Sequence, residues 1–255
     1  MISRKALLID ITMCVGCNGC QDACKAQNKL PAGEEHELSA SAYTALEVHG
    51  ETYVRRMCQH CQDPTCVSVC PVGAFTKTAA GPVLYDENKC IGCRYCMQAC
   101  PFQVPRYEWT SLKPRVQKCR FCSERVNAGK QTACAEICPT GATKFGNRED
   151  LIREANERIK AEPTKYVNRL YGLDDVGGTS ILYITSVPFE QLGFKTNLMK
   201  EPLPDLTWNA LSKIPSMVSV GGVFLAGIYW ITSRREEVER AEGKHAQKGR
   251  TEARH

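Results

Sequence analysis

The stretch Cys14-Val-Gly-Cys17-Asn-Gly-Cys20-Gln-Asp-Ala-Cys24 decides the fold, because the chain returns to its pattern three more times. All sixteen cysteines of the 255 residues fall into four groups, which are Cys14, Cys17, Cys20, Cys24; Cys58, Cys61, Cys66, Cys70; Cys90, Cys93, Cys96, Cys100; and Cys119, Cys122, Cys134, Cys138. The first and third groups have the spacing C-x2-C-x2-C-x3-C, which is typical of ligands to [4Fe–4S] clusters. The second and fourth groups keep the C-x2-C start and the C-x3-C end, but they have more residues between the second and third cysteines. Four groups of four thiolates predict four clusters and an electron-transfer protein.

The spacing has a physical reason. Three closely spaced cysteines wrap one cluster, while the fourth is carried away and reaches the other cluster of a pair. Pro71, Pro101 and Pro139 follow the last cysteine of groups two, three and four. Proline there fixes φ and removes an N–H donor, so it helps to turn the chain out of the motif. Group one has Lys25 instead, and we expect its charge to lie near a cluster and raise the reduction potential.

Other uses of cysteine fit the pattern less well. Zinc sites also use C-x2-C pairs, but the Cys-Pro endings have no role in a zinc ribbon. A disulfide framework belongs to short secreted chains. His60, between Cys58 and Cys61, is a possible iron ligand, but with every thiol present we favour a hydrogen bond near the cluster.

The formal charge of +5 counts every thiol as neutral. Four cluster cores of about +2 each, bound by thiolates, add about −8 and leave the loaded protein near −3. The basic balance is therefore no argument for nucleic-acid binding. A P-loop and a G-x-G-x-x-G motif are both missing from the sequence, so a nucleotide site is not supported. Because the motif loops are poor in large apolar residues, we expect the apo chain to be largely unfolded.

Hydrophobic patterns predict a strand before each motif and a short helix after it. The expected strands are residues 5–11, a hairpin at 45–57 around Gly50, residues 82–85 and residues 180–187, and a helix capped by Asn147 should run to about residue 162. This repetition predicts an α+β fold of two pseudo-twofold ferredoxin-like units that carry four clusters, followed by one transmembrane helix. The expected parts are a four-cluster domain over 1–187, an extended connector over 188–213, the transmembrane helix over 214–233 and a charged, partly disordered tail over 234–255.

Residues 214–233 form an uncharged run of twenty residues, long enough as a helix to span roughly 30 Å of bilayer. Lys213 and Arg234 bracket the run, and Trp208 and Trp230 stand where an aromatic belt would lie. The alternative is a buried helix of a soluble domain, which seldom has so long an uncharged run.

The basic residues near the span predict its orientation. Those upstream are Lys195, Lys200 and Lys213, and those downstream are Arg234, Arg235, Arg240, Lys244, Lys248 and Arg250. The positive-inside rule therefore puts the tail in the cytoplasm and the cluster domain on the periplasmic face. The first residues contain no apolar signal region and no twin arginine, so we expect export alongside a signal-bearing partner. A cytoplasmic cluster domain is the alternative.

The strings CQHCQDPTCVSVCP (58–71), YDENKCIGCRYCMQACPFQVPRY (85–107) and ACAEICPTGATKFG (133–146) resemble the four-cluster iron–sulfur subunits of the molybdopterin oxidoreductase superfamily. The later LYGLDDVGGTSILYITSVP (170–188), followed by one membrane helix, resembles the beta subunits of membrane-bound formate dehydrogenases. It is also similar to the iron–sulfur subunit of membrane-bound nickel–iron hydrogenases.

The resemblance implies which cysteines share a cluster. The implied sets are Cys14, Cys17, Cys20 with Cys138; Cys119, Cys122, Cys134 with Cys24; Cys58, Cys61, Cys66 with Cys100; and Cys90, Cys93, Cys96 with Cys70. It also implies the partners: a molybdenum or tungsten pterin subunit that donates electrons, and a quinone-reactive membrane subunit of cytochrome b or similar type that accepts them. The membrane helix would dock beside the second partner.

The chain offers no substrate site of its own, so it is expected to be a non-catalytic electron-transfer subunit. We favour formate dehydrogenase, since hydrogenase relatives usually carry a twin-arginine leader. The alternatives are the same role in a nickel–iron hydrogenase or a molybdopterin reductase, and a membrane-tethered polyferredoxin that shuttles between partners. The sequence does not distinguish the donor, the direction of electron flow, the cluster potentials or the oligomeric state.

Overall fold

The computed structural model describes residues 4–252, and it describes side chains for residues 4–240. The chain divides into two compact units, with the boundary between Pro204 and Asp205. The first unit holds all four cysteine groups, and the second is helical.

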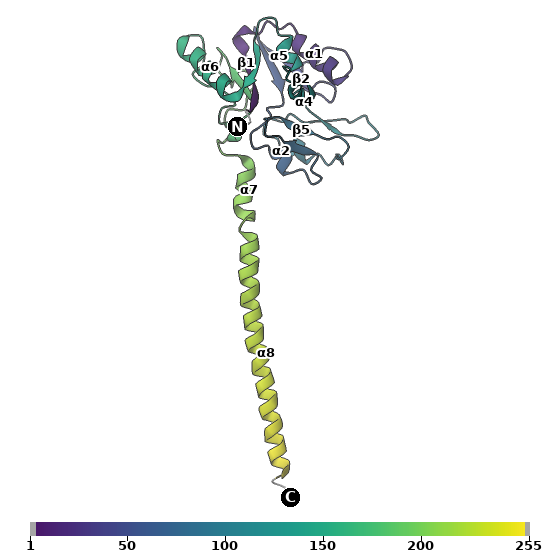
Figure 1. Ribbon diagram of the computed structural model, residues 1–255, viewed down its shortest axis with the longest axis vertical. Helices are drawn as coiled ribbons and strands as arrows, with labels where there is room; N and C mark the ends of the chain where they lie inside the picture. The colour runs from purple at the N-terminus through teal and green to yellow at the C-terminus, as the bar shows by residue number, and fades with distance from the viewer. Residues whose placement is uncertain (1–3, 253–255) are drawn as a thin grey trace. The chain divides into compact units, whose positions relative to one another are not determined.

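A three-stranded sheet organises the first unit (Figure 1). Its central strand β1 (Lys5–Asp10) pairs antiparallel with β8 (Thr143–Asn147) and parallel with β9 (Ile181–Ile184). Side chains alternate across β1: Leu7 lies in the core beside the cysteines, while Leu8 faces helix α6. The expected strands over 5–11 and 180–187 are therefore confirmed with shorter bounds, because the 3-10 helix η1 (Ile11–Met13) ends the first one.

Helix α6 (Arg148–Ala161) covers one face of this sheet with Leu151, Ala155 and Ile159. Asn147 occupies its N-cap position as expected, but its side chain makes no cap hydrogen bond. The Asn147 Oδ1 atom instead accepts from Lys5 Nζ at 2.7 Å. The side chain thus ties β8 to β1 rather than satisfying the helix backbone.

Two-stranded ladders lead into the other motifs. The hairpin of β2 (Thr44–His49) and β3 (Thr52–Met57) confirms the expected turn at Gly50, where φ is +61°. The other ladders pair β4 (Phe75–Lys77) with β5 (Val83–Tyr85) and β6 (Arg106–Tyr107) with β7 (Val116–Gln117). Strands β3, β5 and β7 each end a few residues before a cysteine group, so they fix where its loop begins.

Short helices follow the motif loops, and their packing pairs the motifs. They are α1 (Gly19–Asn28), α2 (Thr65–Ser68), α3 (Tyr95–Ala99), α4 (Ser123–Asn127) and α5 (Ala133–Glu136). Helix α1 packs against α5, and α2 packs against α3. The first motif therefore meets the fourth, and the second meets the third.

The segment after β9 is more ordered than an extended connector over 188–213, and we correct that expectation. Phe189 and Phe194 are buried against Tyr171, which the 3-10 helix η2 (Asp175–Gly177) follows. Helix α7 (Leu203–Leu211) then forms the end of the segment. The aromatic side chains explain the difference, because burying each ring removes a large apolar area from water.

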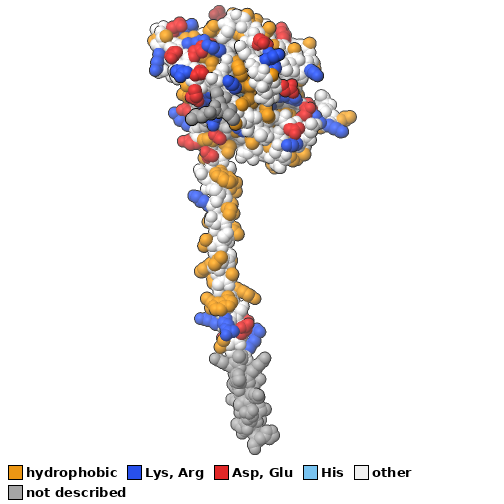
Figure 2. Space-filling model, viewed as in Figure 1, with side chains coloured by type: hydrophobic (Ala, Val, Ile, Leu, Met, Phe, Trp, Pro, Cys, Tyr) orange, Lys and Arg blue, Asp and Glu red, His pale blue; other side chains and the backbone are white. Residues whose placement is uncertain are grey.

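The second unit is dominated by helix α8 (Ile214–Glu252), whose apolar side chains are exposed from Ile214 to Val238 (Figure 2). The stretch Leu203–Arg240 reaches a mean hydropathy of 1.7 in its most apolar window, and none of that window is buried. Ser219 and Thr232 donate to the carbonyls of Pro215 and Ile228, four residues earlier. Their hydroxyls are thus satisfied inside the helix. The helix is compatible with a single membrane span.

Candidate metal centres

The four motif loops share one backbone feature. The residue before the second cysteine is Gly16, His60, Gly92 and Phe121 in turn, with φ of +71°, +46°, +70° and +56°. Glycine adopts this left-handed conformation freely, whereas histidine and phenylalanine are strained in it. The same turn in four unlike sequences shows that the loops are built alike, with two glycines replaced by buried aromatic rings.

The ends of the motifs also repeat. Gly73, Gln103 and Gly141 lie three residues after the last cysteine of groups two, three and four, and each has a positive φ near +60°. Proline follows the cysteine in these groups and the helices end there. In the first group Lys25 replaces proline, and α1 continues to Asn28.

Lys25 does not act as the free charge that the sequence suggested. Its ammonium Nζ lies 3.0 Å from the carboxylate of Glu35 and donates to the Gly33 carbonyl at 2.6 Å. The side chain is buried, and Glu35 compensates its charge. The side chain anchors the loop after α1, and an effect of Lys25 on a cluster potential stays a prediction.

The structure forms three cavities whose walls each contain four cysteines. These are lined by Cys14, Cys17, Cys20, Cys138; by Cys24, Cys119, Cys122, Cys134; and by Cys70, Cys90, Cys93, Cys96. In every cavity, one cysteine is contributed by a different group from the other three. The crossing cysteine is the last member of its group, the one that follows the three-residue step.

The remaining cysteines, Cys58, Cys61, Cys66 and Cys100, form one more set, which we number third; the set of Cys70, Cys90, Cys93 and Cys96 is the fourth. Cys61 lies close enough to Cys58 and Cys100 for their charges to raise its pKa, after the larger effect of burial. The pKa of Cys66 rises to about 12 because of burial, and the charges of Cys58 and Cys100 contribute to the rise. Here too, three members of one group meet the last member of another.

The four sets follow one another in a row. Cys20 of the first set lies near Cys134 of the second. Cys119 of the second set lies near Cys58, which belongs to the third. Cys66 of the third set has Cys96 among its charged neighbours, and Cys96 belongs to the fourth. A row of adjoining sulfur sets is the arrangement that a chain of redox centres requires.

All sixteen cysteines lie within residues 4–252, and all are free thiols, so a disulfide framework is contradicted. Within the same residues, no three histidine, cysteine or acidic side chains come together closely enough to hold a metal ion. Sulfurs that surround a cavity suit a larger inorganic core with an iron at each corner.

Burial raises the pKa of most of these thiols. The pKa of Cys24 rises to about 12 because of burial, and the nearby Cys134 adds to the effect. Cys138 differs: burial raises its pKa, but hydrogen bonds, first that from the Thr143 backbone, lower it below the usual value. Iron binds the thiolate, so cluster assembly in the buried sets must release protons.

His60 is fully buried, and the residues around it fix its role. Its Nδ1 atom accepts a hydrogen bond from the backbone N–H of Val83 at 3.0 Å, and its ring meets Phe121 edge-on at 4.9 Å. Burial and the charges of Lys118 and Lys77 hold the pKa of His60 well below its usual range. The ring is therefore neutral with its proton on Nε2, which has no hydrogen-bond partner among the described residues.

Two lysines near the third set, the buried Lys118 and the half-buried Lys77, were missed by sequence reasoning. Lys118 Nζ donates to the carbonyls of Val83 and Cys119 at 2.8 and 3.0 Å. Lys77 Nζ donates to the carbonyl of Cys61 at 2.7 Å, and burial lowers its pKa to about 8. Lys118 directly precedes Cys119, but a lysine in a motif gives no sign of being buried. Both lysines hold the backbone that carries the cysteines.

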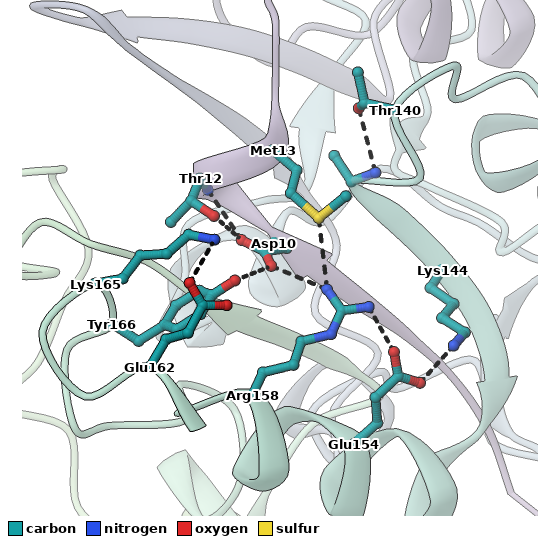
Figure 3. Close-up of polar contacts among 11 residues, drawn as sticks. Asp10, Thr12, Met13, Thr140, Lys144, Glu154, Arg158, Glu162, Lys165 and Tyr166 are labelled. Carbon is teal, nitrogen blue, oxygen red and sulfur yellow. Dashed lines mark hydrogen bonds and ion pairs between the residues drawn. The ribbon is translucent and has the colours of Figure 1, made fainter. Parts of the chain in front are cut away.

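A polar network fixes the entry to the first motif (Figure 3). The buried carboxylate of Asp10 accepts from the Thr12 backbone and hydroxyl at 3.1 and 2.6 Å and from the Tyr166 hydroxyl at 2.8 Å. Arg158 on α6 pairs with Asp10 at 3.0 Å and with Glu154 at 2.6 Å. Strand β1, η1 and α6 are thereby joined just before Cys14.

Comparisons with known proteins agree with this reading of the cysteines. Residues 50–148 match the family described as the 4Fe-4S dicluster domain. The chain is 32% identical over 268 residues to the formate dehydrogenase iron-sulfur subunit of Haemophilus influenzae, covering 94% of this chain and 84% of the relative. It is 39% identical over 202 residues to the formate dehydrogenase-O iron-sulfur subunit of Escherichia coli K12, covering 70% and 66%. It is 35% identical over 254 residues to the hydrogenase-2 operon protein HybA of Escherichia coli O157:H7, covering 81% and 76%.

Proposed function

The chain belongs to the family of 4Fe-4S electron-transfer subunits that includes the iron–sulfur subunits of formate dehydrogenases and HybA, and we propose that it serves a membrane-bound formate dehydrogenase. In this proposal it carries electrons from a molybdenum or tungsten catalytic subunit to a quinone-reactive subunit in the membrane. Two observations support this proposal: formate dehydrogenase subunits are among the relatives of the chain, and helix α8 is apolar.

We propose that each of the four cysteine sets holds one [4Fe–4S] cluster, in two ferredoxin-like units. Cys14, Cys17, Cys20 and Cys138 would hold the first; Cys24, Cys119, Cys122 and Cys134 the second; Cys58, Cys61, Cys66 and Cys100 the third; and Cys70, Cys90, Cys93 and Cys96 the fourth. Clusters bound there would supply one-electron redox centres. The single observation that carries the proposal is the presence of cavities lined by four cysteines from two motifs.

The row of sets supports a relay rather than four separate sites. Each set has a cysteine within electrostatic range of a cysteine in the next set. The chain's part in the relay is to hold the centres in order and to set their surroundings.

Helix α8 would anchor the complex in the membrane and dock beside the quinone-reactive subunit. The basic residues after Ser233 favour a cytoplasmic tail, which would put the cluster domain on the periplasmic face. Exposed apolar side chains along the helix need lipid or a partner around them.

The experiment that tests this function is formate-dependent reduction of a viologen dye by the complex co-purified with the tagged chain in mild detergent. We expect formate to reduce the dye, with hydrogen inactive in the same preparation. A cluster-loaded complex that is inactive with formate would contradict the proposal.

A second candidate is the same relay in a nickel–iron hydrogenase, favoured by the identity to HybA over most of this chain. Hydrogen-dependent dye reduction would establish it. A membrane-tethered shuttle protein is the third candidate. Native electrophoresis of detergent extracts distinguishes it, because a shuttle would migrate as this chain alone and a subunit would migrate with its partners.

A further inference from the structure

Arg55 on strand β3 is a buried cation placed between two cysteine sets. Only 3% of the residue is exposed. Its guanidinium donates through Nε to the Thr44 hydroxyl at 3.1 Å, through Nη1 to the Thr143 hydroxyl at 2.8 Å and through Nη2 to Cys134 Sγ at 3.1 Å. The same side chain lines both the cavity of Cys14, Cys17, Cys20 and Cys138 and the cavity of Cys24, Cys119, Cys122 and Cys134. We call these two sets the first pair.

Arg55 has no acidic partner among the described residues. Besides Cys134, the guanidinium donates to two neutral hydroxyls and to the Met57 sulfur. Cys134 Sγ accepts from its Nη2 atom, and Cys20 and Cys24 line the same two cavities as Arg55. A buried charge without a counter-charge is very costly, so these sulfurs must carry the compensating negative charge.

We propose that Arg55 is the shared counter-charge of the first pair, and that it raises the reduction potential of both clusters bound there. This inference rests on the proposed assignment of clusters to the cysteine sets. A cluster with four thiolates carries about −2, and reduction makes it more negative. A fixed, buried cation beside the clusters stabilises the reduced form more than the oxidised form.

The location of Arg55 makes the effect specific. Arg55 lines the two cavities of the first pair, whose cysteines include Cys20 and Cys24. It is not among the residues that line the cavity of Cys70, Cys90, Cys93 and Cys96. Removing the charge should therefore lower the reduction potentials of the two clusters in the first pair and leave those of the other two unchanged.

The test is a redox titration, followed by electron paramagnetic resonance, of the whole complex carrying Arg55→Met, Arg55→Gln or Arg55→Lys. Iron and sulfide content are measured on the same samples. Arg56→Gln is the matched control, because Arg56 is the next residue but points to Glu47 at 2.8 Å. Two of the four midpoint potentials should fall in both neutral variants, stay closer to wild type in Arg55→Lys and remain unchanged in Arg56→Gln.

Cluster loss also decides the question. If both neutral variants lose about half of their iron while Arg55→Lys keeps it, the positive charge is what holds the first pair, as proposed. Full iron content with unchanged potentials in a neutral variant would overturn the inference. So would Arg55→Lys failing in the same way as the neutral variants. A wild-type complex with clearly fewer than about sixteen irons would instead contradict the cluster assignment.

Discussion

Gly16 shows how closely single residues of the motif loops are constrained. A Cβ atom at Gly16 would lie 2.5 Å from the Tyr53 ring, at a φ of +71°. We expect Gly16→Ala to destabilise the first loop by about 1–3 kcal/mol, because it combines a clash with an unfavourable backbone conformation. Gly141→Ala is the control: its φ is +67°, but nothing lies within 4 Å. Thermal melts with iron analysis should show the larger loss for Gly16→Ala, and equal losses would contradict the clash.

The cysteine sets predict which pairs of substitutions act on the same cluster. Cys100→Ala and Cys58→Ala should both remove the third cluster, so the double variant should keep about twelve irons, like either single variant. Cys100→Ala combined with Cys90→Ala should remove two clusters and leave about eight. Iron analysis measures both combinations. The reverse pattern would place Cys100 with its own group.

At the scale of elements, the ion pair that connects helix α6 to the start of the first motif can be tested by mutation (Figure 3). Asp10 is almost fully buried, and Arg158 supplies its cationic partner. We expect Arg158→Met to destabilise the protein by about 2 kcal/mol, since Thr12 and Tyr166 still donate to the carboxylate. Arg153→Met, on the same helix but paired only with exposed Asp150, should change stability by less than about 0.5 kcal/mol. Anaerobic urea unfolding compares the two, and similar values would contradict a special role for Arg158.

The stability that this ion-pair network contributes should depend on pH, because Glu154 is part of it. Burial acts to raise the pKa of Glu154, but hydrogen bonds from Lys144 and Arg158 overcome it and lower the pKa below its usual value. The carboxylate therefore stabilises the fold above about pH 4.5, and this contribution is lost as pH falls through the folded pKa. We expect Glu154→Gln to be less stable than wild type by about 0.5–1 kcal/mol at pH 7 and by less at pH 4. A difference that grows on acidification would contradict this sign.

Some elements could be predicted from sequence and others could not. The β2–β3 hairpin and α6 carry local signals, namely Gly50 between apolar runs and an apolar stripe after Asn147. The burial of Phe189 and Arg55 has no local signal, because it depends on residues far away in the chain. The grouping of cysteines is visible in the spacing, but the meeting of Cys14 with Cys138 depends on the packing of α1 against α5.

At the scale of the whole molecule, the boundary between Pro204 and Asp205 separates the unit that holds the cysteine groups from the unit that holds the apolar helix α8. A chain truncated after Asp205 should keep its clusters but leave the membrane fraction, because helix α8 is the apolar segment of the second unit. Fractionation of cells, with iron analysis of the soluble chain, measures both outcomes. Retention at the membrane would show that partner subunits provide the anchor.

The central claim is that one chain holds four clusters in a row. Its most direct test is quantitative iron and acid-labile sulfide analysis of the anaerobically purified complex, with spin counting after full reduction. The account predicts about sixteen irons and sixteen sulfides bound by this chain, and about four reduced-cluster spins. Stoichiometric zinc, or only about eight irons with two spins, would contradict it.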